Sequence, residues 1–422
     1  MRTILLFALQ FIVLVSTAQR ECASADYIKQ QRLTKEQYKE TPQAVESFVQ
    51  QTLSGGGPST TLSKVNASTI IRIPVVVHVM YNNAGNNISE EQIKSQIDAL
   101  NRDFRRTNKD AVNTPDYFKP VAADVMIEFF LATSDPKGRP TKGIVRKQSN
   151  VAEWTLDDDI KFSAKGGSDA WDSKSYLNIW VGPLRKILGY SSEPGSPANK
   201  DGIVISTRAF GTIGVSAPFN LGRTAVHEVG HWLGLKHIWG DTYCGDDGID
   251  DTPKQSTYTT GCPSGIRISC SNGPNGSMYM NYMDFTNDEC MNLFTNGQKN
   301  RMRALFYEGG SRSVLAVSKG LNAPWNFEPE VEEIPVSVTV LPAKVSSSIF
   351  PNPAGEEITL NAGDNQWIGK DVQLFNMSGL IIRNIRITNL TQKISLSGMP
   401  KGIYIIKGET AGIKMYHKIA RL

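Results

Sequence analysis

The pattern of apolar and polar positions predicts a mixed α/β domain in the larger part of the chain. IRIPVVVHVMY, residues 71 to 81, is a dense β-branched run that predicts a strand. ISEEQIKSQIDALNRDF follows it, with Ser89 and Gln92 spaced as a capping box and the apolar residues on one helical face. A strand followed by an amphipathic helix is a typical opening of a mixed α/β fold.

The rest of this domain is predicted from later runs. Further strands are expected at residues 125 to 131, 176 to 181 and 202 to 206. A last helix is expected at residues 295 to 306, where Thr295 and Gln298 are spaced as a second capping box. We therefore assign residues 55 to 322 to one domain of the α/β (α+β) class with a mixed sheet.

The pattern changes after residue 322. Residues 324 to 340, PWNFEPEVEEIPVSVTV, contain four glutamates, three prolines and no basic residue, and we interpret residues 323 to 344 as a linker. Beyond it, residues 345 to 422 alternate apolar and polar positions between Gly, Pro and Asn turns. This alternation predicts a small all-β sandwich of antiparallel strands.

The first residues indicate export. Arg2 precedes an apolar run that ends at Val15, and small residues follow, so residues 1 to 18 are predicted to be a secretory signal peptide. No later stretch reaches the roughly 18 apolar residues of a membrane-spanning helix, and we expect no integral membrane segment. With 45 basic and 41 acidic side chains, the net charge of +4 gives no reason to expect a nucleic-acid partner.

The five cysteines suit an exported chain, because disulfides form in an oxidising compartment. Four of them lie between Cys244 and Cys290, and Cys22 stands far upstream. Four cysteines can pair in three ways, and one cysteine is then left over.

Three of the five histidines lie in the eleven residues HEVGHWLGLKH, from His227 to His237. On a helix, His227 and His231 are one turn apart, about 6 Å along the axis, so their imidazoles can converge on one cation. Gly234 can take the left-handed conformation that ends a helix. The chain can then turn so that His237 becomes a third ligand.

Three imidazoles and an open fourth position are typical of a catalytic zinc, whereas a structural zinc usually has four protein ligands rich in cysteine. Glu228 follows the first ligand, where its carboxylate can take a proton from attacking water and pass it to the leaving amine. A single histidine usually packs, caps or faces solvent, and we expect this of His78 and His417. Five fixed residues at fixed spacing arise by chance less than about once in ten million start positions.

The motif HEVGHWLGLKH resembles the zinc motif of the metzincin metallopeptidases, which have a methionine turn beneath the metal. MNYMDF, residues 280 to 285, would supply this turn through Met283. CGDDGIDDTP and NYMDFTNDECMNLFTNGQ further resemble the pappalysin family within that clan. The resemblance covers about residues 70 to 307 and implies a metzincin-like catalytic domain with an active-site helix, acting on proteins and peptides.

The same resemblance implies two disulfides, Cys244–Cys270 and Cys262–Cys290. It also implies structural calcium beside the DTP segment. Four aspartates crowd residues 246 to 251, and hard oxygen ligands from Asp247, Asp251 and Thr252 suit calcium. The alternative is a solvated acidic loop.

Two positions depart from the family pattern. Some relatives have a tyrosine two residues after the turn methionine that stabilises the oxyanion; this chain has Phe285, so that role is vacant or moves, with Tyr282 as the candidate. Some relatives place an acidic residue two positions after the last disulfide cysteine, at the base of a pocket that selects arginine or lysine. Asn292 stands there, and the resemblance therefore does not fix a basic preference.

Cys22 provides a candidate latency device, because a thiolate is a strong zinc ligand. We interpret residues 19 to 54 as a propeptide that places Cys22 on the open position of the zinc, as in several metzincins. The glycine-rich LSGGGPSTTLS forms an exposed connector, and cleavage near Ser54 and Gly55 would release the enzyme. An accidental free thiol or an intermolecular disulfide is the alternative.

LGYSSEP, residues 188 to 194, lies where the family's edge strand would pair with an extended substrate. The alternative is an ordinary sheet edge.

The last domain resembles the sorting domain of proteins exported by the bacterial type IX secretion machinery. The resemblance rests on three segments in order, PNPAGEEITL at 351 to 360, LFNMSGLII at 374 to 382 and KGIYIIK at 401 to 407. It implies passage through the periplasm to the outside of the cell, with a transient stay at the surface. The alternative is an adhesive or carbohydrate-binding sandwich.

Together these features predict a secreted zinc endopeptidase that is made as a zymogen. The alternative from another class is a surface adhesin whose metal centre is structural or vestigial.

Overall fold

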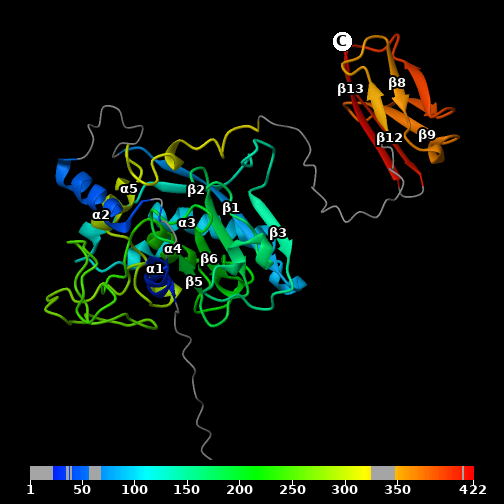
Figure 1. The fold of residues 1–422 in the computed structure, drawn as a ribbon. Coiled ribbons are helices and arrows are strands. Elements are labelled where there is room, and N and C mark those ends of the chain that lie inside the picture. The colour runs from blue at the N-terminus through cyan, green and yellow to red at the C-terminus, as the bar shows by residue number, and fades with distance from the viewer. Residues whose placement is uncertain (1–21, 35–37, 39, 57–67, 325–346, 411–412) are drawn as a thin grey trace, which may run out of the picture. The chain divides into compact units, whose positions relative to one another are not determined.

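The computed structural model describes residues 22–34, 38, 40–56, 68–324, 347–410 and 413–422 (Figure 1). The chain separates into two compact units, Met1–Pro329 and Glu330–Leu422. The predicted signal peptide lies outside the described residues, as does the predicted linker apart from residues 323 and 324. Within the described ranges, no helix is both long and apolar enough to cross a membrane.

One mixed sheet forms the centre of the first unit. Its strands lie in the order β2-β1-β4-β6-β5, and β3 also pairs with β1. The pairs are parallel except for β5 with β6, which is antiparallel. The strands are β1 (Ile71–Tyr81), β2 (Ile127–Leu131), β3 (Ile144–Gln148), β4 (Leu177–Gly182), β5 (Gly189–Ser191) and β6 (Ile203–Ser206).

Strand β1 is buried on both faces, which explains its continuous apolar run. Val75 and Val77 face a core shared with helices α3 (Glu90–Phe104) and α4 (Arg223–Trp232), whereas Met80 belongs to a separate core. Alternate residues of a strand point to opposite faces of the sheet, so the two cores lie on its two sides.

The predicted helices and strands of this unit are present with the predicted type, and two details differ. Ser89 caps α3 by accepting a hydrogen bond from the Gln92 N–H, but the Gln92 side chain donates to the Phe210 carbonyl and the first capping box is half formed. The second box, at Thr295 and Gln298, is complete and starts α5 (Asn296–Ala304). Strand β3, IVRKQ, escaped prediction because its polar residues give no apolar run.

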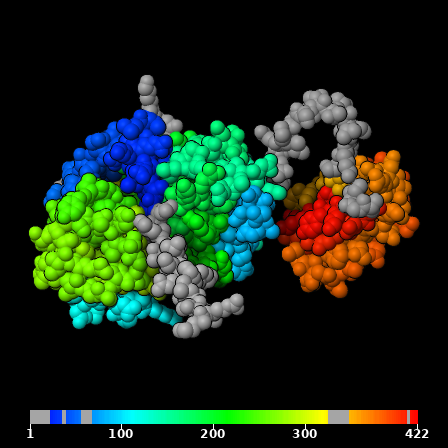
Figure 2. All heavy atoms as spheres, turned by 90° about the horizontal axis from the view of Figure 1, so that it is seen from below, coloured from blue at the N-terminus to red at the C-terminus, as the bar shows by residue number. Residues whose placement is uncertain are grey.

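Two helices of the predicted propeptide belong to the first unit and pack against its remaining residues; they are coloured blue in Figure 2. They are α1 (Ser24–Leu33) and α2 (Pro42–Gln51), and a short π-helix, η1 (Thr52–Gly56), follows. Arg32 of α1 forms an ion pair with Glu193, and Glu46 of α2 forms one with Arg301 of α5. Polar side chains thus fasten both helices to the domain that they precede.

Two disulfides hold the long loop between α4 and α5. They join Cys244 to Cys270 and Cys262 to Cys290, which is the pairing that the family resemblance implies. The sequence separations are 26 and 28 residues, and loops of this size correspond to roughly 3 kcal/mol each in the chain-entropy model.

The second unit is built from two antiparallel sheets, with the orders β10-β9-β12-β13 and β11-β8-β7. An apolar core that includes Leu360, Leu374 and Ile406 draws on both sheets, which confirms the predicted sandwich. The strands are β7 (Ser348–Phe350), β8 (Glu357–Asn361), β9 (Asp371–Asn376), β10 (Ile381–Arg386), β11 (Thr391–Ser395), β12 (Gly402–Thr410) and β13 (Ile413–Arg421).

Candidate metal centre

Helix α4 carries the first two candidate ligands, and both of its ends are defined by local contacts. The Asp288 carboxylate accepts hydrogen bonds from the backbone N–H groups of Leu221 and Arg223, which fixes the first turn. At the other end, Gly234 has a φ of +81° and donates its N–H to the His231 carbonyl at 2.8 Å. The chain therefore reverses where the sequence places its glycine.

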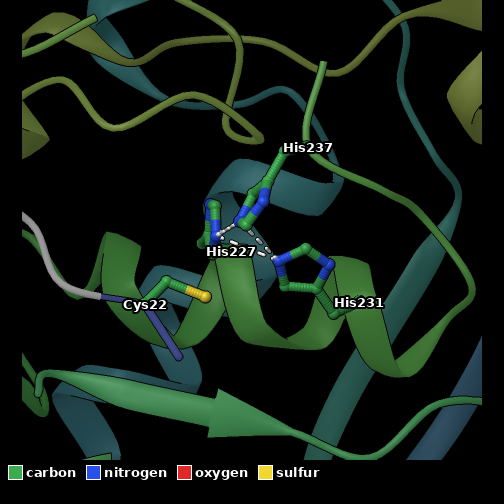
Figure 3. A group of neighbouring side chains, drawn as sticks. All are labelled: Cys22, His227, His231 and His237. Carbon is green, nitrogen blue, oxygen red and sulfur yellow. Dashed lines mark hydrogen bonds between the residues drawn. The ribbon is translucent and has the colours of Figure 1, made fainter. Parts of the chain in front are cut away.

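The three histidines of the motif converge on one point (Figure 3). The Nε2 atom of His231 lies 3.1 Å from that of His227 and 3.1 Å from that of His237, and the third Nε2 pair is separated by 3.3 Å. All three side chains are buried.

Each imidazole is oriented by an oxygen at its other nitrogen. Nδ1 of His227 lies 2.6 Å from the Tyr282 carbonyl, and Nδ1 of His231 lies 2.9 Å from the Leu235 carbonyl. Nδ1 of His237 lies 2.5 Å from a carboxylate oxygen of Asp241. Because these oxygens only accept, the Nδ1 atoms donate and the three Nε2 lone pairs face one another.

This donor set fits a zinc ion. Tetrahedral coordination with Zn–N bonds of about 2.0–2.1 Å places ligand nitrogens about 3.3 Å apart, close to the separations of the three Nε2 atoms. Burial, and then the proximity of His237, lowers the pKa of His231 to about 3, so this ring is neutral as a ligand must be.

Met283 lies directly beneath α4. A Cβ placed on Gly230 would approach the Met283 sulfur to 2.5 Å, so only glycine allows this approach. Trp239 stacks on the His237 ring at 4.2 Å with an interplanar angle of 6°, and Phe285 meets the same ring edge-on at 4.8 Å. The sequence did not reveal the Trp239 contact, because a stacking partner has no characteristic spacing.

The N-terminal segment reaches into this centre. Cys22 Sγ and the three histidine nitrogens all lie within 4.8 Å of one another, and Figure 3 shows the sulfur pointing toward the rings. Burial, with a further contribution from the Glu228 charge, raises the pKa of the Cys22 thiol well above its usual value. A thiolate at this position therefore needs a cation beside it.

Ser24 was not identified from the sequence, yet it contacts Glu228. Its hydroxyl donates to a Glu228 carboxylate oxygen at 2.6 Å and accepts the backbone N–H of Ser191 at 2.9 Å. Cys22 also forms a parallel bridge with Gly189, and the Ala23 N–H donates to the Gly189 carbonyl. The segment thus pairs with strand β5, which lies at the sheet edge as predicted.

The suggested transfer of the oxyanion role to Tyr282 is not supported. Its side chain is fully buried, and its ring lies 5.5 Å from the Arg223 guanidinium. Burial, reinforced by the negative charge of Asp103, raises the pKa of Tyr282 well above its usual value. Tyr282 serves the centre through its carbonyl, which orients His227.

The predicted calcium ligands have different surroundings. Asp247 is buried, one of its oxygens accepts from the Thr252 hydroxyl at 2.7 Å, and its Oδ2 has no hydrogen-bond partner among the described residues. Burial raises the pKa of Asp247 to about 7. Asp251 instead accepts from the Thr295 hydroxyl and the Gly297 N–H, at the start of α5.

Three other residues lie apart from the histidine cluster. Asn292 is buried, and its side-chain oxygen accepts from the Thr114 hydroxyl at 2.7 Å. His78 is in the core between Ser168 and Asn178, where burial lowers its pKa to about 4. His417 lies in the second unit beside Ser347, so His78 and His417 have the structural surroundings expected of them.

Comparisons with known proteins found relatives of both units. Residues 162–307 match the family model of the M43 peptidases, described as pregnancy-associated plasma protein-A, and residues 348–420 match that of a secretion system C-terminal sorting domain. An extracellular metalloprotease of Verticillium alfalfae is 32% identical over 253 residues, which are 56% of this chain and 78% of that protein.

Two solved structures from Tannerella forsythia are similar to the first unit. Mature mirolysin in complex with a cleaved peptide is 48% identical with a TM-score of 0.59, and the match covers 60% of this chain and 98% of that one. A promirolysin mutant is 43% identical with a TM-score of 0.63, and the match covers 71% of this chain and 98% of that one. The match to the pro-form therefore extends over more of this chain.

Proposed function

Since the chain belongs to the M43 peptidase family described as pregnancy-associated plasma protein-A, we propose that this secreted metalloprotease is a zinc-dependent endopeptidase. The observation that carries the proposal is the convergence of three Nε2 atoms 3.1 to 3.3 Å apart, each ring being oriented by an oxygen at Nδ1. Zinc held by His227, His231 and His237 would polarise the scissile carbonyl and acidify the attacking water.

Glu228 has the role of general base and acid. It adjoins the first ligand on α4, and its carboxylate already binds the hydroxyl of Ser24 at 2.6 Å. The same oxygen can take a proton from water and pass it to the leaving nitrogen. Strand β5 would align the substrate through main-chain hydrogen bonds, as strand addition does elsewhere.

Digestion of casein by the processed protein tests this function. We expect digestion that a chelator abolishes, and a loss of about 10²- to 10⁴-fold in Glu228→Ala while zinc content stays unchanged. Glu308→Ala, which removes an exposed carboxylate, is the matched control. A protein that keeps its zinc but cleaves no protein would instead favour an adhesin with a structural metal.

Latency of the precursor is the second part of the proposal. Cys22 lies beside the three histidines, where it would be the fourth ligand, and the Ser24 hydroxyl donates a hydrogen bond to the Glu228 carboxylate. One short segment would therefore block both the metal and the general base. Cleavage of the connector near Ser54 and Gly55, both exposed, would release it.

Calcium is proposed as a structural ion beside Asp247, whose buried Oδ2 has no hydrogen-bond partner among the described residues. Thr252 is adjacent, whereas Asp251 would have to share its oxygens with the start of α5. We expect calcium to raise the melting temperature of the protein, and Asp247→Asn to remove that effect. An equal calcium response in the variant would place the ion elsewhere.

The second unit is proposed to direct export by the type IX machinery, since residues 348–420 match a secretion sorting domain. Deleting residues 345 to 422 is expected to abolish activity in the medium. Normal export with loss of surface binding would favour an adhesive domain.

A further inference from the structure

A tyrosine of the N-terminal segment fills a socket in the first unit. Tyr27, in the first turn of α1, is 1% exposed, and its ring centroid lies 4.8 Å from that of Tyr190. We define the Tyr27 socket by the residues that contact this ring or its hydroxyl, Asp158, Lys161 and Tyr190, and by two that contact Lys161 or Asp158, Trp180 and Lys200. All five lie in the part of the chain that would remain after the propeptide is removed.

The socket matches both parts of a phenol. The Tyr27 hydroxyl donates to Asp158 Oδ2 at 2.9 Å and accepts from Lys161 Nζ at 3.0 Å. The Lys161 ammonium also lies over the rings of Tyr27, Trp180 and Tyr190, at 4.7, 5.4 and 5.0 Å from their centroids. A ring without the hydroxyl would remove one hydrogen bond from each of Asp158 and Lys161, which would keep their ion pair and the bond from Lys161 to the Lys200 carbonyl.

The charges of the socket are unusual for a purely structural core. Lys161 and Asp158 form a 2.9 Å ion pair, and both are almost fully buried beneath Tyr27. Burying such a pair costs desolvation energy that apolar residues would avoid, so the pair is poor evidence for a role in stability. Two residues of α1 bind Asp158, namely Tyr27 and, through a longer hydrogen bond, Gln31.

The socket adjoins the line on which a substrate would lie. Cys22 pairs with Gly189 of β5, and Tyr27 is one helical turn further on, with its N–H bonded to the Ala23 carbonyl. Tyr190 follows Gly189 in β5, and its side chain faces the socket. A peptide extended along β5 places alternate side chains on the same face as Tyr190, within reach of the socket.

We propose that the Tyr27 socket becomes a subsite for a tyrosine side chain of the substrate once the propeptide has left. The inference rests on the proposed peptidase function and adds a selectivity remote from the zinc. In the precursor, Tyr27 occupies the subsite as a substrate tyrosine would, and so masks it.

Peptide cleavage by the processed enzyme, obtained by maturation of the full chain, tests the proposal. In a peptide series that places Tyr, Phe, Leu or Glu at each position around one cleavable bond, we expect one position where Tyr exceeds Phe about tenfold in kcat/KM, since only Tyr adds hydrogen bonds to both Asp158 and Lys161. Asp158→Asn is expected to bring this ratio close to one and leave the Leu peptide unchanged. Asn suits the positive φ of this residue, 66°.

Asp157→Asn is the matched control, because it removes the same charge from the adjacent, exposed position. A second measurement does not depend on the folding of the Asp158 variant. A synthetic peptide of residues 22 to 33 carrying Cys22→Ser should inhibit the unmodified processed enzyme, and adding Tyr27→Phe should weaken inhibition about tenfold. Adding Asp26→Asn, at an exposed position, should leave inhibition unchanged.

Several outcomes would overturn the inference. If Leu peptides are cleaved efficiently and Tyr is not better than Phe at any position, the proposed subsite is refuted and the peptidase function is not. Faster cleavage with Glu than with Tyr would show that the lysines alone govern the socket. Absence of any Glu228-dependent cleavage would overturn the proposed function and this inference with it.

Discussion

The metal centre and the propeptide that covers it are held together in opposite ways. The centre takes its three ligands from eleven consecutive residues, and nearby oxygens orient the rings. The cover depends on pairs that are remote in sequence: Ser24 with Glu228 is separated by 204 residues, Tyr27 with Asp158 by 131, and Glu46 with Arg301 by 255. The ligands of the centre are therefore close in sequence, whereas the cover is held by contacts between residues that are remote in sequence.

The difference would suit the proposed maturation, in which the chain loses one part and keeps the other. Residues of the centre share one helix and the turn that follows it, so they stay together after cleavage of the connector. The contacts of the cover include partly exposed ion pairs, which contribute little individually, beside buried contacts of Tyr27 and Val49. Substitutions in the two regions should therefore change different properties.

The largest effect is expected from a ligand. His231→Ala should abolish zinc binding and lower peptide hydrolysis by the processed enzyme about 10³-fold or more, because several kcal/mol of transition-state stabilisation depend on the metal. Metal analysis and kcat/KM measure the result. His417→Ala, in the second unit, is the matched control and should change neither. Unchanged zinc content in His231→Ala would contradict the proposed ligand set.

The second-largest effect is expected from Cys22, the propeptide residue that lies beside the three histidines. Cys22→Ala in a precursor with an uncleavable connector should raise peptide hydrolysis about 10²-fold, because a zinc–thiolate contact worth a few kcal/mol is lost. The Nε2 atoms and Glu228 are untouched by this change. A variant precursor that stays fully latent would show that the cysteine does not impose latency.

A smaller effect is expected beneath the helix. Gly230→Ala brings a Cβ to 2.5 Å from the Met283 sulfur. Overpacking costs about 1–3 kcal/mol, while alanine gains about 1 kcal/mol in helix propensity, so we expect a net loss near 1 kcal/mol and a melting temperature lower by about 2–4 °C. Adding Met283→Ala to Gly230→Ala removes the clash, and a double variant in which Gly230→Ala still costs the same would refute this cause.

The smallest effect is expected at a partly exposed ion pair of the cover. Hydrogen bonding to Arg301 lowers the pKa of Glu46 to about 2. The pKa of Glu46 is lower when the propeptide is docked than when it is free. The contribution of the ion pair to docking is therefore complete above about pH 4.3 and is lost as the pH falls toward 2. Glu46→Gln should weaken retention of the cleaved propeptide a few-fold at pH 7 and flatten the dependence of retention on pH below 4.3.

Co-elution of the cleaved propeptide with the enzyme on size exclusion measures this retention. Gln51→Glu, at an exposed position of α2, provides a control that alters charge without removing the pair. Identical pH profiles for the unmodified chain and Glu46→Gln would mean that the ion pair does not hold the cover.

Sequence-based prediction succeeded for the metal centre, whose ligands are close in sequence, and failed for contacts between remote residues. The motif from His227 to His237 could be interpreted because helical geometry converts spacing into direction. The elements around it were predicted for the same reason, apart from β3 and the side-chain half of the Ser89 box. The disulfide pairing came from the family resemblance, since spacing alone leaves three possibilities.

The remaining parts of the site depend on contacts that leave no pattern in the sequence. A carbonyl acceptor such as that of Tyr282 can belong to any residue, so its role became visible only in the fold. Ser24 and Tyr27 bind Glu228 and Asp158, which are distant in the chain. Their spacing in the sequence does not predict these contacts. The suggestion that Tyr282 replaces an oxyanion donor failed because the sequence does not show which way a buried side chain points.

The distribution of sulfur in the chain gives a way to follow maturation. Four cysteines are joined in the loop between α4 and α5, and Cys22 is the single free thiol. If residues 19 to 54 are removed as proposed, the remaining polypeptide would have no thiol left to alkylate. After unfolding without reductant, iodoacetamide would therefore add mass to the precursor and not to the processed enzyme. The fraction of protein that gains this mass would report how much precursor remains.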